Sequence, residues 1–396
     1  MVPKGWKPTQ IGELAKFSSG GTPSKKNDTY WGGNYPWISG KDLKGHYLEN
    51  SVDKLSSEGF RSAKRAPKGS SLILVRGMTL LKDFPVGYAT RELAFNQDLK
   101  ALVPKKDVDG LFLSFLLAGE KHRIRQLVST AGHGTGRLDT ESVKEYPVNL
   151  PPTWEQKKIA QILSTWDKAI TTTEKLLVNS RQQKKALMQQ LLTGKKRLVD
   201  ENGVRFGGDW KMYKLGNLFK ERVETNREDL PLLSITADVG VMYQEDTGRK
   251  NTSNDDKSKY RRICVNDIGY NTMRMWQGRS SLSDKEGIVS PAYTIVIPGD
   301  KIVPAFASYL FKLPELVHVF YRNSQGLVSD TWNLKFNHFN KISWAFPDLY
   351  EQQKIASVLC KADKEIEILQ QKLDFLKQEK KALVQQLLTG KRRVQI

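Results

Sequence analysis

The sequence predicts an α+β protein in which two α/β globular domains are separated by two long α-helices that form an antiparallel coiled coil. Three observations support this fold class. A stretch of about 45 residues occurs twice, at a fixed offset of 196 positions. Each copy carries a heptad pattern of apolar residues, and the segments in front of the copies open alike. We therefore expect an internal repeat with pseudo-two-fold symmetry.

The two copies begin at Glu155 and Glu351, and about half of their paired positions are identical. Both end in Lys-Lys-Ala-Leu-(Met/Val)-Gln-Gln-Leu-Leu-Thr-Gly-Lys. Start signals precede both: Thr153 with Gln156, and Asp348 with Glu351, fit a capping box. Gly194 and Gly390 stand where a left-handed C-cap belongs. Each copy is therefore predicted as one helix of about 57 Å, given a rise of 1.5 Å per residue.

Apolar residues recur in both helices at alternating steps of four and three, which is typical of a coiled coil and not of an ordinary buried helix face. The predicted seam consists of Ile159, Leu163, Trp166, Ile170, Leu177, Leu187 and Leu191 in the first helix, and of Ile355, Leu359, Ile366, Leu369, Leu373, Leu376, Leu383 and Leu387 in the second.

Lys184 and Lys380 interrupt this seam at the same place in both copies. A lysine there can fix the register of the helices or let the seam open, with its charged end reaching water. The alternative is a contact with nucleic acid. Of the two, the sequence favours register or opening of the seam.

The predicted domain boundaries are 1–152 for the first globular domain, 153–199 for the first helix, 200–348 for the second globular domain and 349–396 for the second helix. Both globular segments open on the shared pattern W-K-x-x-x-[IL]-G-x-L, at Trp6 and at Trp210. Parallel helices would separate the ends of the second globular domain by a whole helix length, whereas domain termini usually lie close together. The helices should therefore run antiparallel.

The formal net charge is +20, which indicates a polyanionic partner, most simply double-stranded DNA. Residues 1–152 carry +8 and residues 200–350 only +1, so the second globular domain needs individually placed basic residues to hold DNA. The two cysteines and five histidines show no metal-ligand spacing. An apolar run near 18 residues and a signal-peptide pattern are both missing from the sequence, so we expect a cytoplasmic protein without membrane contact.

Basic, amide and aromatic residues in Gly-rich segments are the candidate DNA contacts. In the first globular domain, lysines interleave with tryptophans and tyrosines over residues 18–45, although those tryptophans could equally belong to the core. Arg76 ends a predicted buried strand, and Arg137 ends a Gly-rich loop, residues 130–138, whose amides could cradle a phosphate. The candidates are Lys25, Lys26, Lys41, Lys44, Arg76, Arg137, Asn271, Arg274, Trp276, Gln277, Arg279 and Trp332.

Motifs of dinucleotide and nucleoside-triphosphate binding are missing from the sequence, namely G-x-G-x-x-G and G-x-x-x-x-G-K-[ST]. The sequence therefore predicts a non-catalytic chain with no catalytic residues and no metal or cofactor of its own. Two alternatives stay open: a coiled-coil scaffold with protein-binding heads, and a free-standing DNA-modifying enzyme.

The paired helices, and their approaches Leu150-Pro151-Pro152-Thr153-Trp154-Glu155-Gln156 and Phe346-Pro347-Asp348-Leu349-Tyr350-Glu351-Gln352, carry a family resemblance. The chain resembles the specificity subunit of Type I restriction–modification enzymes over essentially its whole length. Gly20-Gly21-Thr22-Pro23-Ser24 and Met273-Arg274-Met275-Trp276-Gln277-Gly278 are similar to stretches in the target-recognition domains of that family.

The resemblance implies that each globular domain is a target-recognition domain for one half of a bipartite DNA site. It also implies that the helices set the spacer and dock two methylation subunits, to which motor–nuclease subunits are added. S-adenosylmethionine, ATP and Mg are then expected in those partner subunits. The base sequence, the spacer length, the base-contacting residues and the assignment of domains to half-sites do not follow from the sequence.

Overall fold

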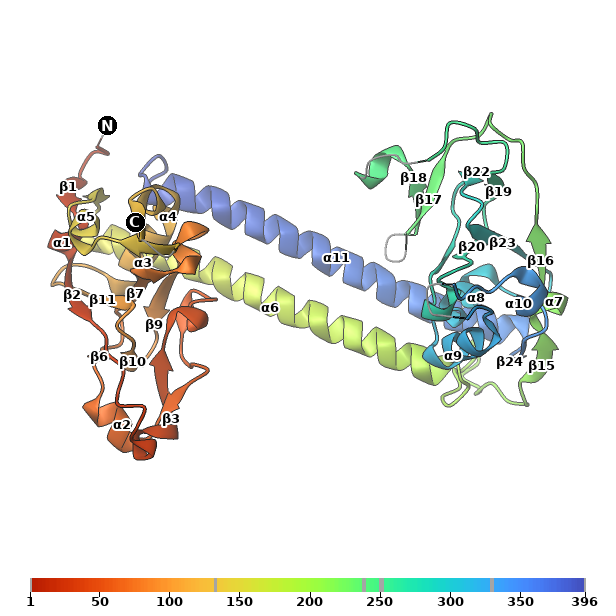
Figure 1. The fold of residues 1–396 in the computed structure, drawn as a ribbon, viewed down its shortest axis with the longest axis horizontal. Helices are drawn as coiled ribbons and strands as arrows, with labels where there is room; N and C mark the ends of the chain where they lie inside the picture. Colours follow the sequence, from red (N-terminus) through yellow and green to blue (C-terminus); the bar gives the residue numbers. More distant parts are fainter. Residues whose placement is uncertain (1, 132–133, 237–239, 249–252, 328–330, 395–396) are drawn as a thin grey trace. The chain divides into compact units, whose positions relative to one another are not determined.

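The computed structural model describes residues 2–131, 134–236, 240–248, 253–327 and 331–394 (Figure 1). The chain divides into two compact units. The first unit combines Met1–Glu174 with Lys372–Ile396, and the second consists of Lys175–Gln371. Each unit thus contains one globular domain and parts of both long helices, α6 (Thr153–Leu191) and α11 (Leu349–Leu388). The division into four consecutive segments stays a prediction.

The globular part of the first unit is built on a five-stranded sheet in the order β2-β11-β7-β9-β4. All four residues of its central strand β7 are buried, and α3 packs against β7 and β9 (Figure 1). The main strands and helices are β1 (Lys7–Gln10), α1 (Ile11–Leu14), β2 (Ala15–Ser19), β3 (Trp31–Ile38), β4 (Tyr47–Leu48), β5 (Lys54–Leu55), α2 (Ser57–Ser62), β6 (Arg65–Ala66), β7 (Ser71–Leu74), β8 (Arg76–Gly77), β9 (Val86–Ala89), β10 (Leu93–Phe95), β11 (Leu99–Pro104), α3 (Gly110–Gly119), α4 (Lys121–Arg125), β12 (Val128–Ala131), β13 (Thr135–Leu138), α5 (Thr140–Lys144) and β14 (Pro147–Leu150). Short 3₁₀ turns are η1 (Asp28–Tyr30), η2 (Gly40–Asp42) and η3 (Met78–Leu81).

The globular part of the second unit has a four-stranded sheet in the order β16-β23-β20-β21. A cluster of phenylalanines from the sheet and from α8, α9 and α10 forms its core. The strands and helices are β15 (Lys211–Lys214), α7 (Leu215–Leu218), β16 (Phe219–Arg222), β17 (Leu233–Ile235), β18 (Val241–Tyr243), β19 (Arg261–Ile263), β20 (Ile268–Asn271), β21 (Ser280–Leu282), β22 (Gly287–Val289), β23 (Tyr293–Pro298), α8 (Pro304–Leu310), α9 (Pro314–Asn323), α10 (Phe336–Phe339) and β24 (Ser343–Phe346), with the 3₁₀ turns η4 (Glu245–Thr247) and η5 (Met275–Gln277).

The two globular parts share a topology despite their different sequences. In both, the strand after the first tryptophan pairs antiparallel with the strand in front of the long helix: β1 with β14, and β15 with β24. In both, the next strand lies at a sheet edge beside a long central strand, as β2 does beside β11 and β16 beside β23. The duplication predicted from the helices therefore extends through the globular parts.

Helices α6 and α11 pair antiparallel, as predicted. In the first unit Lys380 pairs with Asp167, while Lys377, nearer the start of α11, pairs with Glu174, further along α6, at 2.8 Å. As the residue number increases along α6, the number of the contacting residue in α11 therefore decreases. In the second unit the hydroxyl of Ser180 donates to Glu365 at 3.0 Å, in the same opposed sense.

The predicted seam residues are buried or half-buried throughout, but they do not all lie between the helices. Ile159, Leu163 and Leu387 belong to the core of the first unit. Leu191, Ile355 and Leu359 belong to the core of the second. The ends of the heptad pattern therefore pack into the globular cores, which makes the helix ends parts of the units.

The helix ends follow the predicted signals in part. The Asp348 side chain accepts from the amide of Glu351 at 2.8 Å, as an N-cap does, but the Glu351 carboxylate pairs with Arg197, so only half of the predicted capping box forms. The Thr153 hydroxyl instead donates to the Asp107 carbonyl at 3.1 Å, so the capping box predicted there does not form. Gly194 and Gly390 have φ values of 70° and 68°, as expected for left-handed caps.

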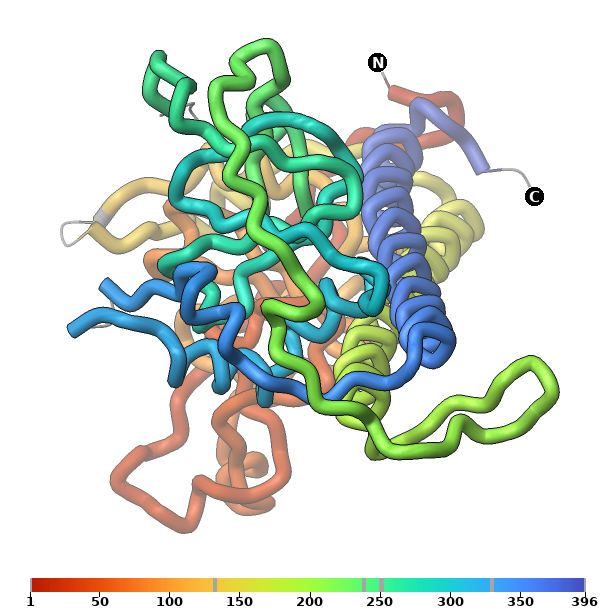
Figure 2. Tube along the Cα trace, turned by 90° about the vertical axis from the view of Figure 1, so that its right-hand side faces the viewer, coloured from red at the N-terminus to blue at the C-terminus, as the bar shows by residue number. Residues whose placement is uncertain are grey.

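The connection between α6 and β15 is a hairpin-shaped loop. A bridge joins Val199 to Arg205, and the amide of Phe206 donates to the Leu198 carbonyl at 3.0 Å. Figure 2 shows this loop, in yellow-green, standing out beside the end of α6. Within the described residues no helix is long and apolar enough to cross a membrane.

Candidate nucleic-acid interface

Arg76 and Arg137, which are far apart in the sequence, meet in the first unit. They lie directly opposite each other in the pairing of β8 with β13, and both are exposed. They line a cavity of about 320 Å³ together with Gln97, Lys100 and Asp139. The two arginines were predicted separately, and Gln97 and Lys100 were not among the predicted DNA contacts, because the strand pairing that brings these residues together is not visible in the sequence.

The Gly-rich stretch before Arg137 was expected to be a phosphate-cradling loop. The structure makes it a hairpin in which β12 pairs antiparallel with β13 over Val128–Ala131 and Thr135–Leu138. Residues 132–133 lie outside the described residues. Gly136 is needed because a Cβ there would stand 2.8 Å from the Leu80 side chain. The glycine therefore permits close packing of β13 on η3.

The lysines of residues 18–45 are exposed, and the aromatic residues beside them are largely packed. Trp37 is buried in a small cluster with Leu55 and Phe60, against which Trp31 and Tyr35 pack. Lys41 pairs with Asp53 at 2.7 Å, and this hydrogen bond raises the pKa of the Lys41 amine. Lys25, Lys26 and Lys44 present their amines to solvent. The core interpretation of the tryptophans holds for Trp37.

In the second unit the candidate residues surround one tight turn after β20. The Asn271 side chain accepts from the Met273 amide at 3.0 Å, and the Asn271 amide donates to the Arg279 carbonyl at 3.1 Å. Asn271 and Arg279 line a small cavity of about 50 Å³. Gln277 and Arg279 are exposed, and Arg274 is half-buried. The turn thus groups two arginines with two amide side chains.

Trp276 and Trp332 pack against each other at this turn. Their rings meet edge to face at 5.3 Å, and Trp332 packs in the same way on Tyr321 of α9 at 4.9 Å. The Trp276 Nε1 donates to the Met273 carbonyl at 2.9 Å. Both tryptophans are half-buried, so they hold the turn against α9 in addition to any contact that they make with a ligand.

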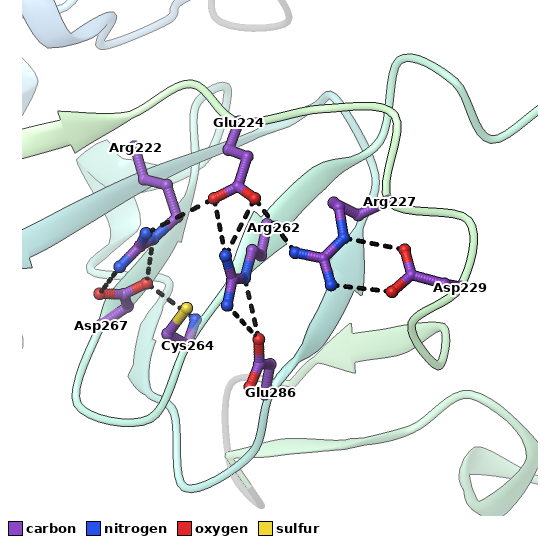
Figure 3. Close-up of polar contacts among 8 residues, drawn as sticks. All are labelled: Arg222, Glu224, Arg227, Asp229, Arg262, Cys264, Asp267 and Glu286. Carbon is purple, nitrogen blue, oxygen red and sulfur yellow. Dashed lines mark hydrogen bonds and ion pairs between the residues drawn. The ribbon is translucent and has the colours of Figure 1, made fainter.

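Other arginines of the second unit are neutralised within a network of ion pairs (Figure 3). Arg222 pairs with the buried Asp267 at 2.7 Å. Arg262 donates to Glu224 at 2.9 Å and also pairs with Glu286. Arg227 bridges Glu224 and Asp229. Since these arginines are committed to carboxylates, they hold this part of the sheet together and are poor candidates for phosphate contacts.

Buried polar residues at the start of each long helix were not among the predicted site residues. Glu155 and Glu351 are fully buried, and each accepts a two-pronged ion pair, from Arg393 at 2.7 Å and from Arg197 at 2.6 Å. The two pairs are related by the 196-residue offset, since Glu155 corresponds to Glu351 and Arg197 to Arg393. In each pair the glutamate comes from one copy of the repeat and the arginine from the other. Glu351 was predicted only as part of a capping box and Glu155 was given no role, so neither ion pair was predicted.

Gln156 and Gln352 extend these junctions. Gln156 accepts from the Asp109 amide at 2.8 Å and donates to the Pro151 carbonyl at 2.9 Å. Gln352 makes the equivalent bonds, to the Val303 amide at 2.9 Å and the Pro347 carbonyl at 3.0 Å. The repeated Glu-Gln dipeptide thus clamps each globular part to its helix.

The part of the chain that the structure describes contains no group of three or more His, Cys, Asp or Glu side chains arranged to hold a metal ion.

The fold and the site together define an internally repeated protein with two globular parts of one topology and different exposed polar surfaces. The family model of the Type I restriction modification DNA specificity domain matches residues 3–179 and 207–378. The chain therefore belongs to the family of Type I restriction–modification DNA specificity subunits.

Individual relatives agree with this assignment. The chain is 29% identical over 165 residues to the EcoR124I/EcoR124II specificity subunit of Escherichia coli, a match covering 41% of this chain and 40% of that one. It is 24% identical over 422 aligned positions to the MjaVIII specificity subunit of Methanocaldococcus jannaschii, covering 99% and 94%. The match to the E. coli subunit thus spans about two fifths of that relative.

Solved structures share the fold. The S subunit from M. genitalium superposes with a TM-score of 0.62 at 15% identity, covering 98% of this chain and 99% of that one. The HsdS subunit from Thermoanaerobacter tengcongensis gives a TM-score of 0.51 at 16% identity, covering 99% and 98%.

Proposed function

We propose that the chain recognises a bipartite DNA site, with each globular part reading one half while the paired helices set the spacer. The single observation that carries this proposal is the repetition of the junctions. The Arg–Glu pairs and the glutamine clamps recur at a fixed offset in both units. Two heads held alike but carrying different polar surfaces are suited to two different half-sites, because half-site spacing follows protein geometry.

We further propose that the helices dock two methylation subunits and that motor–nuclease subunits complete the complex. The methylation subunits would bind S-adenosylmethionine and modify a flipped adenine. ATP and Mg would serve the motor–nuclease subunits. Exposed apolar side chains on the long helices, among them Leu176, Ile368 and Phe375, support a helix surface that partners cover.

Selection from a random duplex library tests the proposal. The purified chain is incubated with 40-base-pair duplexes of random sequence, and the bound fraction is sequenced. We expect two short specified blocks separated by an unspecified spacer of constant length. Enrichment of one continuous block, or binding without sequence preference, would refute bipartite recognition, and no DNA binding at all would favour the protein-binding scaffold.

The second unit offers a sharper test. Arg274→Ala and Arg279→Ala should relax the preference in one specified block and leave the other block unchanged, since both arginines belong to one globular part. Lys25→Ala with Lys26→Ala, in the first unit, serves as the matched control. An equal loss of affinity on every sequence would instead indicate contacts with phosphate.

A further inference from the structure

The cavity beside Arg76 and Arg137 is lined by three basic side chains and one carboxylate, that of Asp139. Lys100 also lines it, and its amine donates to the uncharged hydroxyl of Ser19 at 2.6 Å. Within the described residues neither arginine has a carboxylate at ion-pair distance. The carboxylate in the lining, Asp139, is occupied as the N-cap of α5, accepting from the Ser142 amide at 2.9 Å. Hydrogen bonds from Ser142 hold the pKa of Asp139 below its usual value, and the positive charge of Arg137 adds a smaller effect in the same direction.

The placement of the two arginines costs stability in the free protein. Arg76 and Arg137 are cross-strand partners, and like charges directly opposite each other on paired strands repel. Local rules of strand pairing are broken in this way mainly at functional sites. An acceptor-rich ligand placed between the two guanidinium groups would remove the repulsion.

The second unit has a cavity at the equivalent position, of about 540 Å³. The equivalence rests on backbone contacts. The amide of Leu138 donates to the Val75 carbonyl at 2.9 Å, and the amide of Leu334 donates to the Thr272 carbonyl at 2.8 Å. The strand pairings agree as well, since Ser129 faces Arg137 and Gln325 faces Asn333.

The side chains at the equivalent positions differ in charge. By the shared strand registers, Arg76 corresponds to Met273, Lys100 to Thr294 and Arg137 to Asn333, and all three counterparts line the second cavity. That lining also holds three charged residues, of which Glu221 and Arg261 pair with each other at 2.7 Å, while Lys335 occupies the position of Asp139 in the first unit. Ala292 and Phe336 add apolar surface. Three cationic positions in the first unit are thus neutral in the second.

We propose that these two cavities are equivalent specificity-determining sites, an inference that rests on the proposed recognition of DNA. In the first unit Arg76, Lys100 and Arg137 bind an acceptor-rich group of the duplex, either the O6/N7 edge of a guanine or a backbone phosphate. In the second unit Met273, Asn333 and Phe336 bind an uncharged base edge, with the apolar side chains suited to a thymine methyl group. The difference in charge at the three equivalent positions would therefore distinguish the two half-sites.

The test converts the first cavity toward the second with the double variant Arg76→Met/Arg137→Asn. The full chain and the variant are titrated with the selected duplex, and with duplexes changed at each base, over a range of salt concentrations. A guanine contact predicts that discrimination at one base pair of one half-site falls by about tenfold or more. A phosphate contact predicts uniform weakening and a shallower salt dependence, by about one unit of log–log slope per cation removed.

Two further variants make the outcome decisive. Arg76→Lys/Arg137→Lys keeps the charge but loses the guanidinium fork, so it should lose guanine discrimination and keep the salt dependence. Met273→Ala/Asn333→Ala should alter the other half-site alone. Parental affinity, discrimination and salt dependence in Arg76→Met/Arg137→Asn would overturn the inference while leaving DNA recognition intact. Failure of the parent chain to select any duplex would instead overturn the proposed function.

Discussion

At the scale of single residues, the two Arg–Glu pairs are the contacts on which the junctions depend. Glu155 is fully buried, and its carboxylate also accepts from the Trp6 indole at 3.0 Å. Arg393 lies over the Trp6 ring at 5.8 Å and donates to the Lys4 carbonyl. Arg393, which follows α11, therefore neutralises the buried carboxylate of Glu155 at the start of α6.

Arg393→Ala should loosen this junction, because it leaves a buried carboxylate without its cation. Loss of one partner of a buried pair costs on the order of 3 kcal/mol. We expect faster hydrogen exchange at the start of α6 and in β1. Arg197→Ala is the matched variant and should affect the start of α11 instead. The double variant Glu155→Gln/Arg393→Ala should recover part of the loss, and equal exchange in all variants would contradict the assignment.

His46 is a second residue whose burial has a measurable consequence. Its ring stacks on Phe115 at 4.5 Å, and its buried Nε2 has no hydrogen-bond partner within the described structure. Burial lowers the pKa of His46 from 6.5 to about 4, although Asp167 opposes this shift and Lys380 adds to it. His46 is therefore neutral in the folded protein near neutral pH.

The free energy of unfolding of the first unit should fall as the pH drops from about 6.5 towards 4. In that range His46 is protonated in the unfolded chain but stays neutral in the folded protein. At pH 5 the expected loss is about 2 kcal/mol. His46→Phe keeps the stacking and should remove this part of the acid sensitivity. Urea denaturation of both proteins at pH 7.5 and pH 5 measures it. The same acid-induced loss in both would refute the role of His46.

At the scale of elements, the structure places Lys184 and Lys380 between the helices. Lys184 pairs with Asp363 at 2.5 Å and lies over the Tyr309 ring, whose hydroxyl donates to the same carboxylate at 2.6 Å. Lys380 pairs with Asp167 and lies over Phe115. Both lysines are mostly buried at side-chain exposures of 22% and 23%. Their placement favours a role in helix register over contact with nucleic acid.

Reversal of the charge at Lys184 should therefore weaken the second unit. Lys184→Asp places two carboxylates together, and we expect a loss on the order of 1 kcal/mol in the free energy of unfolding. The swap Lys184→Asp/Asp363→Lys should restore most of it, as a double-mutant cycle would reveal. Lys380→Asp with Asp167→Lys repeats the test in the first unit. If Lys184→Asp left stability unchanged but weakened DNA binding, the nucleic-acid role would be favoured.

At the scale of the whole molecule, each compact unit draws on both repeats. The first unit needs the end of α11 for its core, and the second needs the end of α6. The first unit therefore has all of its core residues only when α11 is complete, whereas the second has them once the chain has passed Leu359.

If the helices set the spacer, a longer pair should lengthen the recognised site. An inserted heptad keeps the seam in phase and adds about 10.5 Å, close to three base pairs at 3.4 Å each. We propose insertions after Glu174 in α6 and after Gln371 in α11, where the two units divide. Selection from the random library should return the same two blocks with a longer spacer. An unchanged spacer would refute this role of the helices.

The sequence predicted much of the fold because helix periodicity and duplication are local signals. The antiparallel pairing, the glycine caps and the burial of the seam follow from the spacing of residues such as Leu163 and Leu359 and from chain connectivity. The hairpin over residues 128–138 was missed because its glycines suggested a loop, and its pairing with β8 depends on a strand some 60 residues earlier. The DNA contacts themselves stay predictions.

By itself the sequence determined that this protein is a duplicated, basic, helix-linked molecule of the specificity-subunit type, because repeats and heptads are written in residue order. Tertiary structure alone decided which polar residues meet. It brought Arg393 to Glu155, Lys184 to Asp363, and Arg76 to Arg137 with Lys100 nearby. These contacts depend on strand register and helix packing between segments that are distant in the chain. Neither can be read directly from the spacing of residues in the sequence.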